Sequence, residues 1–421
     1  MSYSHKPVRT DTKDTARKSD GPCPVMRACG GCAWLNLPYR KQLARKQRAM
    51  EELFEPLIAK HGFECEVEPI YGMGGRAGME GKIASPRGFR HKAASPFAPG
   101  PDGRIKCGFF ARGTHDIVGV PDCCVEAPGA RAILNGVAEA AERCHIPAYE
   151  EDRGRGLLRY AVVRTGYHTD EVMLTVVTKE RRMPHYRQFV DALKDIDPRI
   201  TTVAQNINPK MTNAILGGES HILAGRARMR DRLLSCTFEI SPTAFYQTNP
   251  EQTEVLYSLT IEGMELQNGD VLLDAYCGSG TIGMCAAAEA RQQGLDIKLI
   301  GIEKNHFGVR DADRNAELNE LGSSTRFIEA DATEYLLHAA KRGEHVDVLA
   351  LDPPRAGSTP AFINAACSMN PRRIVYISCN PETQVRDLEI FAQAGYRMVS
   401  LKLVDMFPHT SHVETVVVLA K

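Results

Sequence analysis

The sequence predicts an α/β protein whose carboxyl-terminal part is a doubly wound parallel sheet. Two observations carry this prediction. Beyond Gly269, apolar strand-like segments alternate regularly with helical stretches, and the chain ends in two strands with no room for a helix between them. The five predicted parallel strands are Val271–Ala275, Lys298–Ile302, Thr325–Ile328, Val346–Leu351 and Arg373–Ile377. The last two segments, Arg397–Asp405 and Val413–Ala420, predict an antiparallel hairpin.

The chain has 421 residues, more than one hydrophobic core usually holds, so we expect more than one domain. Residues 1–20 are polar and predict a disordered tail. Residues 21–240 contain short β-rich runs such as Val172–Thr178 and predict an irregular, mostly β domain, whereas residues 241–421 form the α/β domain. Apolar spacing over residues 39–60 predicts a helix that packs on the α/β domain.

The net charge of zero hides a division between the two parts. Residues 1–240 hold 37 Lys and Arg against 28 Asp and Glu, whereas residues 241–421 hold 15 against 24. The basic part suits a polyanionic partner and the acidic part a cationic cofactor, although the same split can reflect only solvated surfaces. The sequence has no long apolar run and no signal-peptide core, which predicts a cytoplasmic protein without a membrane partner.

A glycine-rich turn, residues 276–281, follows the first predicted strand of the α/β domain, and glycine lets backbone approach a ligand closely there. Glu303 ends the second strand, where an acidic side chain binds ribose hydroxyls. The turn lacks the Lys-Ser/Thr ending of a phosphate-binding loop, so the site favours S-adenosylmethionine, a sulfonium cation, over a nucleoside triphosphate or NAD. Asp331, after the third strand, fits a helix cap and an adenine contact about equally.

Two polar motifs follow the fourth and fifth predicted strands, at the edge where doubly wound sheets bind ligands: Asp352–Arg355 and Ser378–Pro381. Cys379 is therefore a candidate nucleophile, and Glu414, at the end of the chain, is a candidate base. A strand-end cysteine is more often a packing residue, and a glutamate is more often solvated. Cys277, within the glycine-rich turn, is a rival thiol.

Five segments occur in the same order as the motifs of the RNA uracil-C5 methyltransferase family and closely resemble them. They are Phe245–Asn249, Asp274–Gly280, Asp352–Arg355, Ser378–Pro381 and Asp405–Glu414. The resemblance implies a Rossmann-like class I methyltransferase domain, for which the terminal hairpin is typical, beside a β-rich RNA-binding domain. It also implies S-adenosylmethionine as the cofactor. Ala275 departs from the family, which commonly has a larger apolar residue at that position.

The resemblance also implies a role for each motif residue. The position matching Cys379 is the nucleophile, and the position matching Glu414 is the proton acceptor. A thiolate added to C6 of uracil puts electron density on C5, which then takes the methyl group, and a base must afterwards remove the C5 proton. The positions matching Gln247, Tyr276, Glu303 and Asp352 belong to the cofactor site, with Asp352 also close to the target base.

Cys23, Cys29 and Cys32 form a compact set of three thiols in Gly/Pro-rich surroundings. In a reducing compartment such a set predicts a metal site with a fourth ligand from elsewhere, and the spacing alone fits zinc or a [4Fe-4S] cluster. The set resembles that of the rRNA-modifying members of the family, which implies a [4Fe-4S] cluster with Cys123 as the fourth ligand. Cys124 replaces a proline of those members and is the alternative ligand.

RNA is the expected partner, and its target base must leave the stack to reach Cys379. The predicted RNA contacts are the segment Gly88–Lys92, which resembles a family segment, and Arg226, Arg228 and Arg230, which period-two spacing puts on one face of a strand. For the arginines, a solvated face is the alternative. The sequence thus predicts C5 methylation of a uridine in 23S rRNA. The alternatives are a tRNA uridine C5 methyltransferase and a non-catalytic RNA-binding or assembly factor, and no protein partner is implied.

Overall fold

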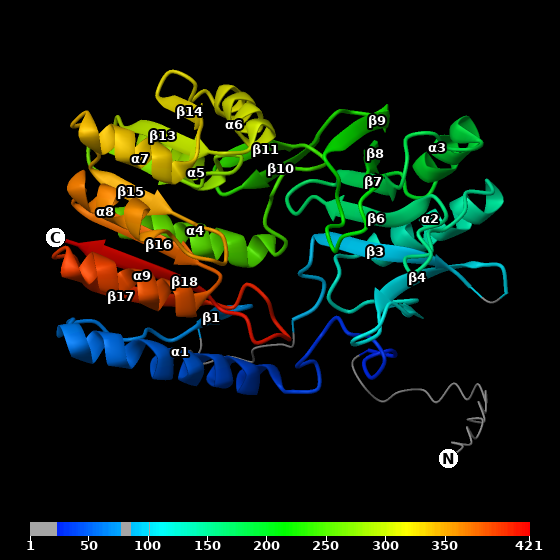
Figure 1. Ribbon diagram of the computed structural model, residues 1–421, viewed down its shortest axis with the longest axis horizontal. Coiled ribbons are helices and arrows are strands. Elements are labelled where there is room, and N and C mark those ends of the chain that lie inside the picture. The colour runs from blue at the N-terminus through cyan, green and yellow to red at the C-terminus, as the bar shows by residue number, and fades with distance from the viewer. Residues whose placement is uncertain (1–22, 77–85, 101) are drawn as a thin grey trace, which may run out of the picture.

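The computed structural model describes residues 23–76, 86–100 and 102–421. The predicted disordered tail, residues 1–20, lies outside the described residues. Figure 1 shows two sheet-based parts side by side, with α1 (Tyr39–His61) lying along the part that contains the carboxyl terminus. None of the described helices is long and apolar enough to cross a membrane.

The larger part is built on a nine-stranded mixed sheet in the order β14-β13-β12-β15-β16-β18-β17-β1-β2. Its parallel strands are β12 (Val271–Ala275), β13 (Lys298–Glu303), β14 (Thr325–Glu329), β15 (Val348–Leu351) and β16 (Arg373–Ser378). The last strand, β18 (Glu414–Ala420), is inserted antiparallel between β16 and β17 (Arg397–Val404). The short strands β1 (Tyr71–Gly72) and β2 (Gly75–Arg76) extend the edge beyond β17. The predicted parallel strands and the terminal hairpin are confirmed.

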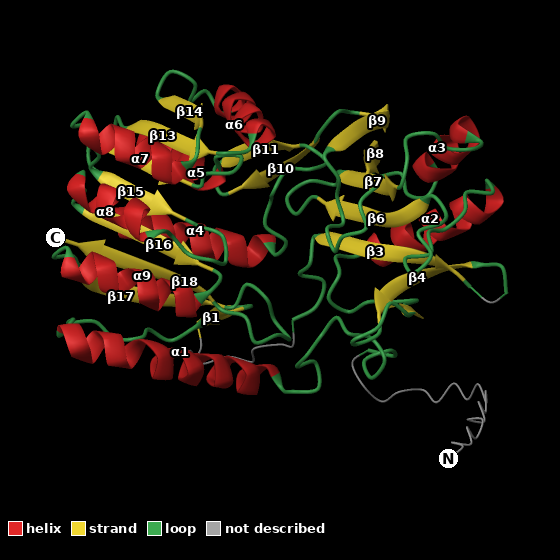
Figure 2. Ribbon diagram, in the orientation of Figure 1, coloured by secondary structure: helices red, strands yellow, loops and turns green. Residues whose placement is uncertain are grey.

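Helices cover both faces of this sheet, as Figure 2 shows. One face carries α4 (Pro250–Met264), α5 (Thr281–Gln292) and α6 (His306–Leu318). The other carries α1, α7 (Ala332–Lys341), α8 (Pro360–Ser368) and α9 (Pro381–Gln393). Successive strand residues alternate between the two cores: Leu272 packs in the first and Leu273 in the second. Both faces of each central strand are thus buried, which explains the nearly continuous apolar runs in the sequence.

The second part is a seven-stranded sheet in the order β5-β4-β3-β6-β7-β8-β9. Its strands are β3 (Lys92–Pro99), β4 (Ile105–Phe110), β5 (Ile117–Gly119), β6 (Leu158–Thr165), β7 (Val172–Thr178), β8 (Ile200–Ile207) and β9 (Glu219–Gly225). The helices α2 (Ala130–Arg143) and α3 (Tyr186–Lys194) pack on this sheet through a third core. This sheet, residues 92–225, lies within the region 21–240 for which the sequence predicted short β-rich runs.

Two segments before residue 241 pack with the carboxyl-terminal part. Phe54 and Leu57 of α1 share a core with Leu388 and Phe391 of α9. The hairpin of β10 (Met229–Leu233) and β11 (Cys236–Ile240) packs in the core of α4 and α5. The cores of the α/β part therefore include α1 and the β10–β11 hairpin, which come before the glycine-rich turn in the sequence.

The prediction that Arg226, Arg228 and Arg230 share one strand face is wrong. Gly225 ends β9 with a left-handed backbone (φ +75°), and β10 begins only at Met229, so Arg226 and Arg228 lie in the connection between the two strands and only Arg230 lies in a strand. Each arginine also forms an ion pair with an acidic side chain. The pairs are Arg226–Glu171, Arg228–Asp311 and Arg230–Glu239. Sequence spacing could not reveal these partners, which lie 9 to 83 residues away.

Candidate active site and cysteine pocket

Cys379 and Glu414 lie opposite each other at one end of the nine-stranded sheet. Cys379 directly follows β16, and Glu414 begins β18, the antiparallel neighbour of β16. Ser378 is paired in register with Thr415, so the next residues along, Cys379 and Glu414, come to the same level. Opposed residues of an antiparallel pair have Cβ atoms about 5 Å apart, which places a thiol and a carboxyl group within reach of one planar base.

A strand-to-helix turn fixes the backbone of Cys379. The Ser378 hydroxyl accepts the Asn380 N–H at 3.0 Å and donates to the Asn380 carbonyl at 3.0 Å. The Asn380 amide donates to the Arg355 carbonyl at 2.8 Å, which ties this turn to the segment after β15. The helix α9 then begins at Pro381, where the missing N–H costs no hydrogen bond. The thiol is therefore held by rigid elements.

Mutual electrostatic perturbation shows how closely the titratable groups gather here. Burial raises the pKa of Glu414 well above its usual range, and Asp352 raises it further, whereas Arg355 lowers it. Burial also raises the pKa of Cys379, with added effects of Glu414 and Asp352, and Arg355 again opposes them. Burial raises the pKa of Asp352 to about 7. A cleft with several displaced pKa values is a typical functional site.

An open groove lies beside Cys379, with an empty volume of about 890 Å³ that includes open solvent. Four parts of the chain line it: α1, through Met50 and its neighbours, Arg355 of the segment after β15, the turn after β16, and the loop 405–413, through His412 and its neighbours. The Arg355 guanidinium and His412 Nδ1 approach to 3.3 Å. The groove is large enough to admit a nucleotide alongside the thiol.

The predicted cofactor turn adopts a left-handed backbone at Tyr276 (φ +65°), Gly278 (φ +57°) and Gly280 (φ +75°). Glycine reaches such angles without strain, which explains the two glycines. Glu303, at the end of β13, accepts the Gly278 N–H at 3.0 Å and the Asn305 N–H at 2.6 Å. The structure thus brings the predicted acidic residue and the predicted turn together.

Asp274 belongs to one of the five family-like segments, but the sequence did not predict it as a separate site residue. It lies near the end of β12, is 1% exposed, and accepts the Gly283 N–H at 2.9 Å through Oδ2. Its Oδ1 is buried without a hydrogen-bond partner among the described residues. Burial, with smaller effects of Asp352 and Glu303, raises its pKa to about 7. A buried carboxylate without a cation is costly, so this site suits a positively charged ligand. Its place before the glycine-rich turn was the signal available in the sequence.

Asp331 has the capping role that the sequence offered as one alternative. Its Oδ1 accepts the N–H groups of Thr333 at 3.0 Å and Glu334 at 3.3 Å at the start of α7, while Oδ2 pairs with Lys304 at 3.4 Å. The Tyr276 ring lies on the same side of the sheet, with its centroid 5.3 Å from that of Phe362.

Gln247 lines a different pocket, together with His91, Arg164 and Asp231. No hydrogen bond described in the structure joins Gln247 to the cofactor turn. The His91 N–H donates to the Thr248 carbonyl at 2.7 Å, so the predicted RNA-contact segment Gly88–Lys92 runs beside the Phe245–Asn249 motif. At its other end, the Gly88 N–H donates to the Cys124 carbonyl at 2.9 Å. This segment therefore connects the cysteine region to the α/β part.

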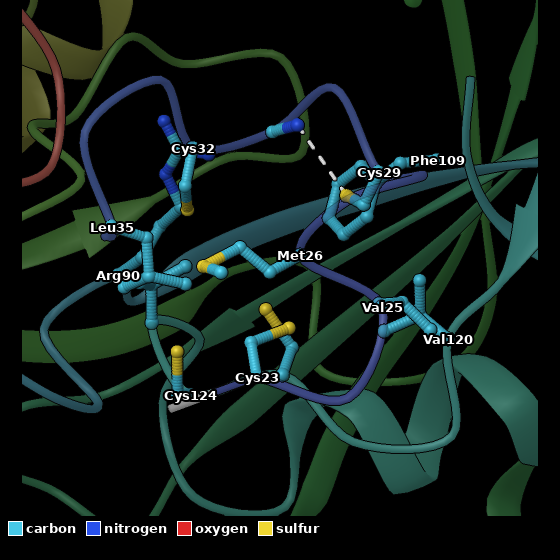
Figure 3. Close-up of a pocket in the computed structure, with 13 residues that line it drawn as sticks. Cys23, Val25, Met26, Cys29, Cys32, Leu35, Arg90, Phe109, Val120 and Cys124 are labelled. Atoms are coloured by element: carbon cyan, nitrogen blue, oxygen red, sulfur yellow. Dashed lines mark hydrogen bonds between the residues drawn. The ribbon is translucent and has the colours of Figure 1, made fainter. Parts of the chain in front are cut away.

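Cys23, Cys29, Cys32, Cys123 and Cys124 line a single pocket, shown in Figure 3. Burial, together with the proximity of Cys123 and Cys124, raises the pKa of Cys32 to about 12. The Met26 side chain also lines the pocket and lies among the thiols in Figure 3. Within the described part of the chain, no three or more His, Cys, Asp or Glu side chains are arranged to hold a metal ion. The predicted ligands thus gather, but they do not form a closed coordination shell.

Comparison with known proteins decides the family. Residues 169–421 match the family described as tRNA (Uracil-5-)-methyltransferase. An uncharacterized RNA methyltransferase of Bacillus cereus is 34% identical over 414 residues, covering 98% of this chain and 85% of the relative. The chain belongs to the tRNA (uracil-5-)-methyltransferase family. A further uncharacterized RNA methyltransferase, of Staphylococcus aureus, is 36% identical over 395 residues, which are 94% of this chain and 83% of that protein.

A solved structure of a similar protein supports the same family. The crystal structure of Pyrococcus abyssi tRNA (uracil-54, C5)-methyltransferase in complex with S-adenosyl-L-homocysteine has a TM-score of 0.73 and 28% identity to this chain, covering 94% of this chain and 86% of that one. The predicted class I methyltransferase fold is therefore confirmed. The present chain is accordingly an S-adenosylmethionine-dependent RNA methyltransferase that acts on C5 of uracil.

In this methyltransferase, replacing Asp274 by asparagine is expected to stabilise the ligand-free protein above neutral pH and to weaken cofactor binding. The folded-state pKa of about 7 exceeds the usual 3.8. The folded protein therefore keeps a proton that the unfolded chain loses, and stability falls as pH rises from about 4 to about 7. The loss at high pH can reach about 4 kcal/mol, since the shift is about three pKa units. Thermal unfolding of both proteins across this range measures the effect. Parallel stability curves would contradict it.

Proposed function

We propose that this protein methylates C5 of a uridine in RNA through a covalent bond between Cys379 and C6 of the base, with Glu414 as the proton acceptor. The observation that carries the proposal is the opposition of Cys379 and Glu414 across β16 and β18, beside an open groove. A non-catalytic RNA-binding factor does not require a thiol and a buried carboxyl group on opposed positions of two neighbouring strands.

The reaction follows from what these side chains can hold and release. The Cys379 thiolate attacks C6, and the ring becomes an enolate with electron density on C5. The Arg355 guanidinium lowers the pKa of the thiol and so favours the attacking form. S-adenosylmethionine supplies an electrophilic methyl group when it is bound. Glu414 then takes the C5 proton, the electrons of that C–H bond restore the ring double bond, and Cys379 leaves as a thiolate.

Most of the proposed cofactor residues lie at or just beyond the carboxyl ends of β12, β13, β14 and β15. Glu303 suits the ribose hydroxyls at the end of β13, and the turn with Tyr276 approaches the ligand through its backbone. The carboxylates of Asp274 and Asp352 would interact with the positive charge of the bound cofactor. This attraction would offset the free-energy cost of burying the two carboxylates. Gln247 joins the proposed set by resemblance to the family, and Asp331 joins it as an adenine contact because it follows β14, the neighbour of β13 in the sheet.

We assign 23S rRNA as the substrate, because the cysteine set resembles that of the rRNA-modifying members of the family. A tRNA uridine is the second candidate, favoured by the likeness to the Pyrococcus abyssi tRNA (uracil-54, C5)-methyltransferase over 94% of the chain. The basic amino-terminal part suits either polyanion.

Deleting the protein from its source cell is expected to remove a 5-methyluridine from 23S rRNA. Mass-spectrometric mapping of 23S rRNA and tRNA from the deletion and parent strains measures this loss. Complementation with the wild-type chain, but not with Cys379→Ala, serves as the control. Loss from tRNA alone would transfer the assignment to the second candidate, and unchanged rRNA and tRNA would contradict both.

We propose further that Cys23, Cys29, Cys32 and Cys123 hold a [4Fe-4S] cluster. Four thiolates are the ligands such a cluster takes, and the five cysteines of this pocket supply that donor set. When bound, the cluster would crosslink the amino-terminal segment to the segment before α2. The methyl transfer needs no electron, so its proposed contribution is structural.

Anaerobic purification is expected to give a brown protein with about four iron atoms per chain. Cys23→Ser is expected to lose the iron, whereas Cys65→Ser is the control, because Cys65 lies outside the pocket. Comparing Cys123→Ser with Cys124→Ser identifies the fourth ligand. A colourless protein with stoichiometric zinc would overturn the cluster.

A further inference from the structure

The loop 405–413 joins β17 to β18 and leads directly into Glu414. Its far end, Ser411 to Val413, lines the groove beside Cys379. The loop has no regular secondary structure, and His409 within it has a left-handed backbone (φ +64°), which is unfavourable for a residue other than glycine. Other parts of the chain must therefore hold the loop in this shape.

A buried ion pair from α1 holds the start of the loop. Lys46 pairs with Asp405, and both side chains are 0% exposed. The Lys46 ammonium also donates to the Phe407 carbonyl at 3.1 Å. The Tyr39 hydroxyl donates to the other oxygen of Asp405 at 2.7 Å. Across the loop, the Asn249 amide donates to the Met406 carbonyl at 3.0 Å, so the loop is tied from two sides.

Gln42, one turn earlier on α1, holds the strained residue itself. Its Oε1 accepts the His409 N–H at 2.8 Å, and its Nε2 lies 3.1 Å from His409 Nδ1. The His409 Nε2 lies 3.1 Å from the Pro86 carbonyl, so a neutral ring protonated at Nε2 satisfies both contacts. The Trp34 N–H donates to the His409 carbonyl at 2.9 Å. All four polar positions of His409, namely the N–H, the carbonyl and both ring nitrogens, thus have partners from amino-terminal segments.

The chain just before α1 links this arrangement to the cysteine pocket. Gln42 Nε2 also contacts the carbonyls of Trp34 at 3.1 Å and Leu37 at 2.8 Å, and Trp34 follows Cys32 by two residues. Cys379, in contrast, takes its support from Ser378, Asn380 and the segment after β15. The two partners of the proposed chemistry are therefore held by separate parts of the chain.

We infer that Lys46 and Gln42 of α1 are positioning residues for proton removal by Glu414, acting through the loop 405–413. The inference rests on the proposed function. It assigns to the amino-terminal helix a role in one step of the reaction. The helix α1 orients the carboxylate of Glu414 and does not affect the position of the Cys379 thiol. Methyl transfer to the Cys379 adduct should therefore survive a defect in α1, while release of the C5 proton should not.

The test uses RNA substrate with tritium at C5 of uridine and measures two quantities in single turnover. The first is the denaturant-stable protein–RNA adduct, and the second is tritium released to water. In Lys46→Met and in Gln42→Leu, tritium release is expected to fall about 10- to 100-fold, because a displacement of about 1 Å costs that much. Adduct formation is expected to stay within about twofold of the wild type, so the adduct accumulates.

Lys60→Met is the matched control, since Lys60 lies on the same helix in an exposed pair with Glu389 and contacts no residue of the loop. Because Lys46→Met leaves Asp405 buried without its partner, the double variant Lys46→Met/Asp405→Asn keeps the test possible if the single variant unfolds. In this double variant the thermal midpoint is expected to recover while the defect in tritium release persists.

Two outcomes would overturn the inference. If Gln42→Leu and the double variant are folded and release tritium at the wild-type rate, then α1 does not position Glu414. Equal losses of adduct formation and tritium release would show a general structural role. Failure of the proposed function is distinguishable, because the wild-type protein would then release no tritium and would form no adduct with RNA that contains 5-fluorouridine.

Discussion

Replacing Cys379 by alanine is expected to abolish methylation, with a loss on the order of 10⁴-fold or more, because Cys379 supplies the thiolate that adds to C6 of the uracil ring. The structure gives the reason: the thiol follows β16 on a fixed turn, at the level of Glu414. RNA containing 5-fluorouridine measures the covalent step directly. Fluorine at C5 cannot leave as a proton does, so wild-type protein with cofactor should remain bound to the RNA after denaturation.

The variants that lack other thiols separate this explanation from its rival. Cys367→Ala removes a half-buried thiol of α8 and should leave the adduct unchanged. Cys277 is the rival nucleophile, but it is 6% exposed within the cofactor turn, and burial raises its pKa well above the usual range. An adduct that survives Cys379→Ala but disappears in Cys277→Ala would contradict the proposed mechanism.

Much of the α/β part could be predicted because its signals are local. The strand β12 and the turn after it follow from an apolar run that ends in glycines, and the same residues form the strand and the turn in the structure. The position of Glu303 follows from the alternation of strands and helices. The opposition of Cys379 and Glu414 depends on the order β16-β18-β17, whereas the sequence predicted only a terminal hairpin that carries Glu414.

Contacts between distant segments could not be predicted. The partner of Lys46 lies 359 residues away, and nothing in the spacing of α1 distinguishes this buried lysine from the exposed Lys41. The arginines at 226–230 looked like an RNA-binding face because the acidic side chains that neutralise them are supplied by other elements. Asp274 was overlooked as a separate site because its unpaired oxygen becomes apparent only from burial.

Replacing Glu414 by glutamine is expected to stall the reaction after methyl transfer. The amide has nearly the shape of the carboxyl group but cannot accept the C5 proton, so turnover should fall about 10²- to 10⁴-fold. Addition of Cys379 to C6 does not require this carboxylate. Native RNA should therefore remain attached to the protein, with the methyl group already on C5, and mass spectrometry of the digested adduct detects it.

The pH dependence supplies a second, independent measurement. Burial and Asp352 raise the pKa of Glu414, so the carboxyl group holds its proton in the ligand-free protein at pH values where a solvated glutamate is ionised. Only the ionised form accepts a proton, and the rate of C5 proton release in the wild type should rise with pH through this displaced pKa. In Glu414→Gln this rise should vanish, leaving only the pH dependence of adduct formation, which reports the thiol of Cys379.

An unchanged pH profile of proton release, or an adduct that does not accumulate, would mean that another group removes the proton. Asp352 is then the next candidate, since it is close enough to raise the pKa values of both Glu414 and Cys379.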